Sequence, residues 1–227
     1  MRRIALDTET TGLNPLDGHR IVEIGCIELE ENIPTGKEWH AYINPERPMP
    51  EAAYAVHGLS EEFLLNKPIF KDIAGDFINF INGAELVIHN AKFDIGFLNN
   101  ELKKTGLSTI DLKKTIDTVQ LAREKIPGAA ASLDALCKRF DIDLSIREKH
   151  GALLDAKLLA EVYLELTGGR QASLTLTQKN KEKNNEKNKE EKESIEGLKF
   201  TSIKLTEKDL EDHREMLKKI NSPLWLK

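Results

Sequence analysis

The chain has 227 residues, which is enough for one sizeable domain and a smaller appendage. Its formal net charge of −5 argues against a basic protein that binds nucleic acid tightly by itself, although clustered carboxylates that hold cations would add to the same acidic count. No apolar run is long enough for a membrane span or a signal peptide, and Cys26 and Cys137 lack zinc-type spacing, so we expect a cytoplasmic protein with two reduced core cysteines.

Three strand-like segments come first, and the turn-rich pieces between them are short enough for antiparallel neighbours. These segments are residues 2–7, 20–29 and 37–44. After residue 60 the apolar residues change to helical spacing, interrupted by one short buried strand. We expect that strand at 85–90 and helices at 70–81, 91–104, about 117–125, 132–140 and 152–166. This order predicts an α/β fold in which helices pack on a mixed sheet and which ends near residue 168.

The segment after this domain has a different composition. Residues 178–196 contain only Lys, Glu, Asn, Gln, Ser and one Ile, from which no core can be built, so we predict a disordered linker. Beyond it, residues 197–227 include a short amphipathic pattern near 210–220 and the final Trp225. Apolar side chains on so small a segment are expected to be covered by a partner.

The first strand ends in two acids, Asp7 and Glu9. Because side chains alternate along a strand, both carboxylates point to the same face. Two carboxylates at this separation repel each other unless a proton or a cation lies between them. The pair alone is also compatible with an exposed strand end that carries two solvated acids.

Two more acids, Asp94 and Asp155, each continue the apolar stripe of a predicted helix by one turn. An acid on the core-facing side is costly to bury without a partner, although the helix dipole also favours an acid in a first turn. Together with Asp7 and Glu9, they predict four carboxylates that converge on one site. An all-oxygen set of this kind suits Mg²⁺ or Mn²⁺, and two such ions about 4 Å apart cleave phosphodiesters.

His150 precedes the helix that carries Asp155, with Gly151 between them. A histidine in such a place is often a solvated loop residue. Next to a metal site, however, an imidazole that titrates near neutral pH is the natural group to take a proton from an attacking water. We therefore predict that His150 is the general base.

Three motifs carry these residues: DTETTG (7–12), HNAKFD (89–94) and HGALLD (150–155). They resemble the motifs of the histidine-containing branch of the DEDD superfamily of 3′–5′ exonucleases. The resemblance covers about residues 1–168 and implies a ribonuclease-H-like fold, two divalent metals and release of nucleoside 5′-monophosphates from a 3′ end. It implies these roles for individual residues: metal ligation by Asp7, Glu9, Asp94 and Asp155, and general base catalysis by His150.

Four further residues match family positions near the substrate. Thr10, Thr11 and Gly12 resemble the turn that meets the terminal nucleotide, and the alternative is a turn that simply ends the strand. His57, in AVHGL, resembles a residue that lines the same pocket, and the alternative is a packed loop histidine.

Two more residues are predicted to contact the metal ligands without binding the metal themselves. Asn90 would cap the following helix or hold the ligands, and these roles are compatible. Asp117 has the same two readings, as support for the ligands or as the cap of the helix that it begins.

Within the branch, this sequence is similar to the proofreading subunits of bacterial replicative DNA polymerases. QASLTL (171–176) resembles the Q-x-x-L-x-L/F peptide by which replication proteins bind the sliding clamp, here through Gln171, Leu174 and Leu176; the alternative is ordinary linker. The linker and the tail with Trp225 match the family's tether and polymerase-binding end. The resemblance thus divides the chain into an exonuclease domain, a clamp-binding segment, a linker and a polymerase-binding tail, at residues 1–168, 169–177, 178–196 and 197–227.

The expected function is removal of mispaired nucleotides from DNA 3′ ends, with frayed single-stranded DNA, the polymerase catalytic subunit and the sliding clamp as partners. An exonuclease that trims RNA would have an indistinguishable active site, although it would have no use for a clamp peptide. The third reading is a non-catalytic adaptor between clamp and polymerase. The intact set of four acids and a histidine argues against it, because an adaptor need not keep a costly carboxylate cluster.

Overall fold

The computed structural model describes residues 1–145, 147, 149–168 and a few positions of the tail, namely 207–208, 211 and 215–216. The chain divides into two units, residues 1–179 and 180–227. The described tail positions are helical, and the sheet with the helices that pack on it belongs to the first unit.

A five-stranded sheet in the order β3-β2-β1-β4-β5 forms the centre of this unit. The strands are β1 (Arg2–Thr10), β2 (Ile21–Glu30), β3 (Ile33–Tyr42), β4 (Glu85–Ile88) and β5 (Thr115–Asp117). β1 pairs antiparallel with β2 and parallel with β4, while β2 and β3 are antiparallel and β4 and β5 are parallel. The prediction of a mixed sheet with helices packed on it is confirmed.

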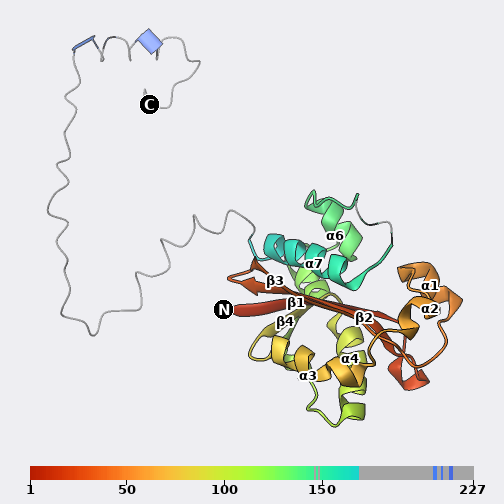
Figure 1. The fold of residues 1–227 in the computed structure, drawn as a ribbon. Coiled ribbons are helices and arrows are strands. Elements are labelled where there is room, and N and C mark those ends of the chain that lie inside the picture. Colours follow the sequence, from red (N-terminus) through yellow and green to blue (C-terminus); the bar gives the residue numbers. More distant parts are fainter. Residues whose placement is uncertain (146, 148, 169–206, 209–210, 212–214, 217–227) are drawn as a thin grey trace, which may run out of the picture. The chain divides into compact units, whose positions relative to one another are not determined.

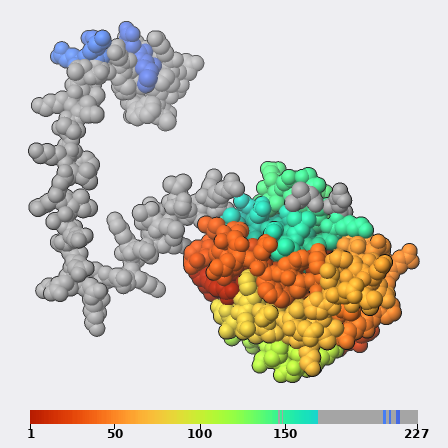
Figure 2. All heavy atoms as spheres, viewed as in Figure 1, coloured from red at the N-terminus to blue at the C-terminus, as the bar shows by residue number. Residues whose placement is uncertain are grey.

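Helices cover both faces of the sheet (Figure 1). The α-helices are α1 (Glu51–His57), α2 (Glu61–Leu65), α3 (Phe70–Ile81), α4 (Ala91–Thr105), α5 (Thr118–Lys125), α6 (Leu133–Arg139) and α7 (Ala152–Leu166). Two short 3-10 helices lie at η1 (Pro15–Asp17) and η2 (Leu112–Lys114). Figure 2 shows α6 and α7 on one side of the strands and α3 on the other. In the described part of the chain, no helix is long and apolar enough to cross a bilayer.

The alternation of side chains along β1 builds two separate cores. Ile4 and Leu6 are fully buried against α3 and α4, in one cluster with the phenylalanines of those helices. Ala5, between them, points to the other face and packs with α6 and α7. The same alternation continues beyond Leu6, so Asp7 and Glu9 lie on the same face as Ala5, which is the face that α7 covers.

The hairpin between β2 and β3 is tighter than the sequence suggested. The residues 31–36 were expected to form a loop, but only Glu31 and Asn32 form the turn, and β3 begins at Ile33. Both turn residues have positive φ, 49° and 70°, as a two-residue hairpin that matches the twist of the strands requires. The short elements β5, α1 and α2 were not predicted from the sequence.

Candidate active site

The two acids of β1 lie where that strand ends. Glu9 is 8% exposed, and burial together with the charges of neighbouring carboxylates raises its pKa from 4.5 to about 8. Burial, and then the charges of Asp94 and Glu9, raise the pKa of Asp7 well above its usual range. Strongly raised pKa values of this kind are typical of a functional site.

Asp94 enters the same site from the first turn of α4. The side chain is buried, and burial raises its pKa from 3.8 to about 7 against the opposing effect of a hydrogen bond from Thr8. The Thr8 hydroxyl donates this bond to Asp94 Oδ1 over 2.7 Å. Thr8 lies between Asp7 and Glu9 in β1, so its side chain points to the α4 face. The bond thus joins the start of α4 to the end of β1.

Asp155 reaches the site because α7 begins directly on top of β2. Gly25 pairs with Asp7 across the antiparallel register. A Cβ atom on Gly25 would lie 2.3 Å from the backbone nitrogen of Leu153, so only glycine allows the first turn of α7 to come this close. Asp155 lies in that turn and is 3% exposed, which confirms that it faces the interior as its helical stripe predicted.

His150 completes the arrangement from the loop before α7. Its side chain is half exposed, and its backbone N–H donates to the carbonyl of Val56 in α1 over 3.3 Å. Glu9, His150 and Asp155 each offer one ligand atom, and these three atoms lie within 4.8 Å of one another. The structure therefore gathers the residues of all three motifs at the end of β1.

The chemistry of this cluster fits a hard divalent cation. Asp155 Oδ1 is buried and has no hydrogen-bond partner among the described residues. A buried carboxylate oxygen without a partner is costly, and a cation is one group that would satisfy it. Carboxylate oxygens also suit Mg²⁺ or Mn²⁺, and the mutual repulsion of Asp7, Glu9 and Asp94 would be relieved by the same ion.

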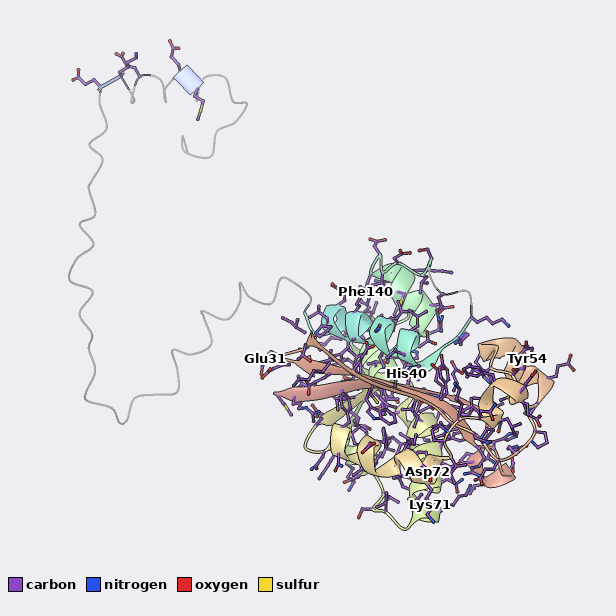
Figure 3. The ribbon with its side chains drawn as sticks, in the orientation of Figure 1. Glu31, His40, Tyr54, Lys71, Asp72 and Phe140 are labelled. Atoms are coloured by element: carbon purple, nitrogen blue, oxygen red, sulfur yellow. The ribbon has the colours of Figure 1, made fainter. Side chains whose placement is uncertain are left out.

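A cavity of about 600 Å³ opens next to the acids, on the side of α1. Its volume is that of a small-molecule site, and apolar side chains contribute much of the wall. The lining includes Glu9, Thr10, Thr11, Gly12, Val56, His57 and Phe93. In Figure 3 the label Tyr54, in α1, marks this end of the sheet, and the label Glu31, in the β2–β3 hairpin, marks the opposite end.

The family described as Exonuclease matches residues 4–163, from β1 into α7. This chain belongs to that exonuclease family. It is 53% identical over 224 residues to DNA polymerase III subunit epsilon of Rickettsia typhi, with 97% of each chain covered. It is 42% identical over 235 residues to the protein of the same name from Escherichia coli, with 99% of this chain and 97% of the other covered. The resemblance read from the three motifs is confirmed, and the protein is a nuclease.

Solved structures agree with this assignment. Exonuclease X in complex with 5′ overhanging duplex DNA is 28% identical, with a TM-score of 0.55 over 73% of this chain and 90% of the other. The nuclease domain of 3′hExo, a DEDDh family member bound to rAMP, is 18% identical, with a TM-score of 0.64 over 73% and 91%. The second likeness supports the ribonuclease-H-like fold alone.

In this exonuclease the Thr-Thr-Gly segment forms one wall of the cavity. The hydroxyl of Thr10 donates to the carbonyl of Gly12 over 2.6 Å, and the hydroxyl of Thr11 accepts from the backbone N–H of Arg20 over 3.0 Å. A Cβ on Gly12 would lie 2.3 Å from the imidazole of His19, so a larger residue here would require His19 to move. Contact of these residues with a nucleotide remains a prediction.

His57 lies at the end of α1 with one ring nitrogen unpaired. Its Nδ1 accepts from the backbone N–H of Leu59 over 3.0 Å, which places the proton of the neutral ring on Nε2. Burial lowers the pKa of His57, and Nε2 has no partner among the described residues. His57 lines the cavity, as the sequence predicts, but its Nε2 atom is itself buried.

Asn90 and Asp117 differ in what they do for α4. Asn90 occupies the N-cap position but its side chain makes no capping hydrogen bond, so that part of the prediction was wrong. Its backbone is left-handed, with φ 65°, and the carboxylate of Asp117 accepts from the backbone N–H groups of Asn90 and Ala91 instead, each over 3.2 Å. Asp117 also caps its own helix α5 through Val119 N–H. Asp117 therefore caps α5 as predicted and also binds the start of α4, the helix that carries Asp94. Its support of the metal ligands stays a prediction.

The sequence reading missed two charged residues at the site. Glu23 of β2 pairs with Glu9 in the sheet register, is buried, and accepts a 2.7 Å hydrogen bond from His40 Nε2; His40 is labelled in Figure 3. Its charge contributes to the raised pKa of Glu9. An acid in the middle of the apolar run of residues 20–29 was the signal that could have revealed it. The second missed residue is Arg147, whose Nη2 donates to Asp155 Oδ2 over 2.7 Å.

The partner-binding predictions fall outside the described residues. This applies to Gln171, Leu174, Leu176 and Trp225, and to the linker at 178–196. They remain expectations from sequence.

Proposed function

We propose that this exonuclease removes mispaired nucleotides from DNA 3′ ends as the proofreading subunit of a replicative polymerase. The observation that carries the proposal is the convergence of Glu9, His150 and Asp155 within 4.8 Å, next to the other two acids and a nucleotide-sized cavity. The two relatives named above are DNA polymerase III epsilon subunits, and Exonuclease X was solved with DNA, which favours a DNA substrate. The bacterial sources of those relatives support a place in the cytoplasm, at the replication fork.

Asp7, Glu9, Asp94 and Asp155 would hold two divalent metal ions, Mg²⁺ or Mn²⁺. When bound, such ions lower the pKa of a water nucleophile and neutralise charge on the phosphodiester. Their number and identity rest on the chemistry of the four carboxylates and the family resemblance. Thr8 and Asp117 position Asp94 by the hydrogen bonds that join β1, β5 and the start of α4.

His150 acts as the general base in this proposal. It lies on a half-exposed loop at the rim of the acid cluster, so its ring can meet solvent and the carboxylates together. A general base needs an unprotonated ring nitrogen within hydrogen-bond reach of the attacking water. The proton that it takes is then released to solvent from the exposed side of the ring.

The cavity would receive the terminal nucleotide. Val56 and Phe93 provide apolar wall for a base, the Thr10–Gly12 turn provides polar atoms for sugar and phosphate, and His57 lines the same cavity. The enzyme would select mispaired ends because an end must be unpaired before it enters, and unpairing a mismatch costs less free energy. A tether to the polymerase would raise the local concentration of DNA ends, so the acidic chain needs no strong DNA affinity of its own.

A primer-template assay tests the proposal. The full chain with Mg²⁺ should remove a mismatched 3′ nucleotide faster than a matched one, and a chelator should stop both reactions. Rapid digestion of short RNA with poor removal of DNA mismatches would favour the RNA-trimming alternative. Absence of Mg²⁺-dependent cleavage of either substrate would leave only the adaptor reading.

A further inference from the structure

Arg147 lies among the acids in the loop that also carries His150. Its side chain is only 8% exposed. Its Nη2 donates to Asp155 Oδ2 over 2.7 Å and lies 2.8 Å from His150 Nδ1, while its Nη1 donates to Asp134 Oδ1. Within the described residues, it is the one Lys or Arg side chain hydrogen-bonded to any of the four predicted metal ligands.

These contacts occupy two groups that the reaction needs. Asp155 Oδ2 is bound to the guanidinium, and its other oxygen is the one without a partner. The same Nδ1 lies 3.2 Å from Asp155 Oδ2. Because a guanidinium has no acceptor, the contact with Arg147 is a hydrogen bond in the tautomer whose Nδ1 is unprotonated and whose proton is on Nε2. Arg147 therefore holds one oxygen of a metal ligand and the unprotonated nitrogen of the predicted base at the same time.

The two anchors of Arg147 differ in their surroundings. Asp155 is buried in the acid cluster, whereas the side chain of Asp134, at the start of α6, is 54% exposed. A cation placed at Asp155 would repel the guanidinium and compete with it for Oδ2. Arg147 could then give up Asp155 and His150 while Asp134 retains it, so the guanidinium is never left without a partner.

We propose that Arg147 is a built-in counter-ion that neutralises Asp155 in the metal-free protein and that a divalent cation must displace. The inference rests on the proposed metal site and adds a positioning residue to it. Its displacement frees Asp155 for the metal and the ring nitrogen of His150 for the attacking water in one movement. The alternative is that Arg147 has a purely structural role and links α6 to α7 by its two ion pairs, which would leave the affinity for cations unchanged.

Direct binding of Mn²⁺ to the full chain without DNA separates the two roles. Arg147→Met removes the charge at similar side-chain length, and Arg123→Met, at an exposed position of α5, is the matched control. By calorimetry or electron paramagnetic resonance, Arg147→Met should bind Mn²⁺ about threefold tighter or more, the equivalent of a weak ion pair, and the control should match wild type. In chelator, Arg147→Met should unfold at a lower temperature than wild type, and Mn²⁺ should raise that temperature by more. Equal or weaker Mn²⁺ affinity would overturn the inference.

Asp134→Asn gives a prediction of opposite sign and leaves the buried groups in place. Without its second anchor Arg147 binds Asp155 alone, so Mn²⁺ affinity should fall, whereas Glu161→Gln on the exposed face of α7 should not change it. Unchanged or tighter binding by Asp134→Asn counts against the inference. If wild type itself binds no Mn²⁺, the proposed metal site fails; if wild type binds and the variants match it, only the role of Arg147 fails.

Discussion

The negative charge of each acid at the end of β1 is repelled by the charge of a neighbouring acid. Asp7 and Glu9 share a face of one strand, and Glu23 faces Glu9 from the next strand. Burial removes the water that would otherwise screen them, so the folded protein binds protons that the unfolded chain releases. Asp7 therefore lowers stability whenever no cation is present, which is the expected cost of the metal-binding role proposed for it.

Asp7→Ala should abolish cleavage and leave the fold intact. The substitution removes one metal ligand and also one source of repulsion, so the variant in chelator at pH 8 should unfold at a temperature no lower than wild type. Hydrolysis of a labelled oligonucleotide with Mg²⁺ and thermal unfolding measure the two effects, with Glu161→Ala as the control for loss of an exposed acid. Full activity of Asp7→Ala would remove Asp7 from the site.

His150→Ala should lower the rate of cleavage by roughly 10²–10⁴-fold, the usual contribution of general base catalysis. Because the remaining residues offer no equivalent base, the dependence of the rate on pH should flatten near neutrality. Single-turnover kinetics at saturating Mg²⁺ measure both effects. A loss below tenfold with an unchanged pH profile would show that His150 is a bystander.

At the scale of elements, the site depends on how closely α7 approaches β2. Asp155 is placed by the first turn of α7, and that turn rests on Gly25. On the other side of the sheet, α4 is fixed by Thr8 and by the Asp117 carboxylate. Two helices on opposite faces thus deliver Asp155 and Asp94 to one strand end, because both begin at that same end.

Gly25→Ala should damage stability and activity together. Its Cβ would meet the backbone of Ala152 and Leu153 at about 2.3–2.4 Å, so α7 must shift, and overpacking of this kind costs about 1–3 kcal/mol. Gly75→Ala is the matched control: it lies on an exposed turn of α3 with open space around it, and should stabilise by up to about 1 kcal/mol. Chemical denaturation and the cleavage assay report both changes. Wild-type activity of Gly25→Ala would contradict the proposed role of this contact.

At the scale of the whole molecule, the buried acids predict how stability depends on pH. The pKa of Glu9 is raised from 4.5 to about 8, and that of Asp94 from 3.8 to about 7. Between these values the unfolded chain has released protons that the folded chain keeps, so the free energy of unfolding falls as pH rises. In chelator, the unfolding temperature should decline from about pH 4.5 to pH 8, by about 2–4 °C for each kcal/mol lost. Mn²⁺ should reverse the decline at pH 8, and a flat profile in chelator would contradict the raised pKa values.

The predicted clamp-binding segment belongs to the same scale, since it would link the nuclease to another protein. Changing Gln171 and Leu174 to alanine should weaken binding to the sliding clamp and leave hydrolysis of a free oligonucleotide unchanged. The reason is that both residues lie beyond α7 and beyond the residues that match the exonuclease family. Surface plasmon resonance with immobilised clamp measures the first effect. Equal clamp affinity would reduce QASLTL to ordinary linker.

Local pattern in the sequence was sufficient for the main elements and the acids. Helical spacing predicted that Asp94 and Asp155 face the interior, and strand alternation predicted that Asp7 and Glu9 share a face; Asp94 and Asp155 are both 3% exposed. Such inferences succeed because the period of a helix or a strand depends only on near neighbours in the chain.

The tertiary structure alone decided which distant residues meet. Glu23 reaches the site through the register of β1 with β2, and Asp117 replaces Asn90 as the side-chain cap of α4 from 27 residues further along. Arg147 enters the acid cluster because α6 supplies Asp134 on one side and α7 supplies Asp155 on the other. These contacts depend on how helices and strands pack against one another, and no period within a single segment carries that information.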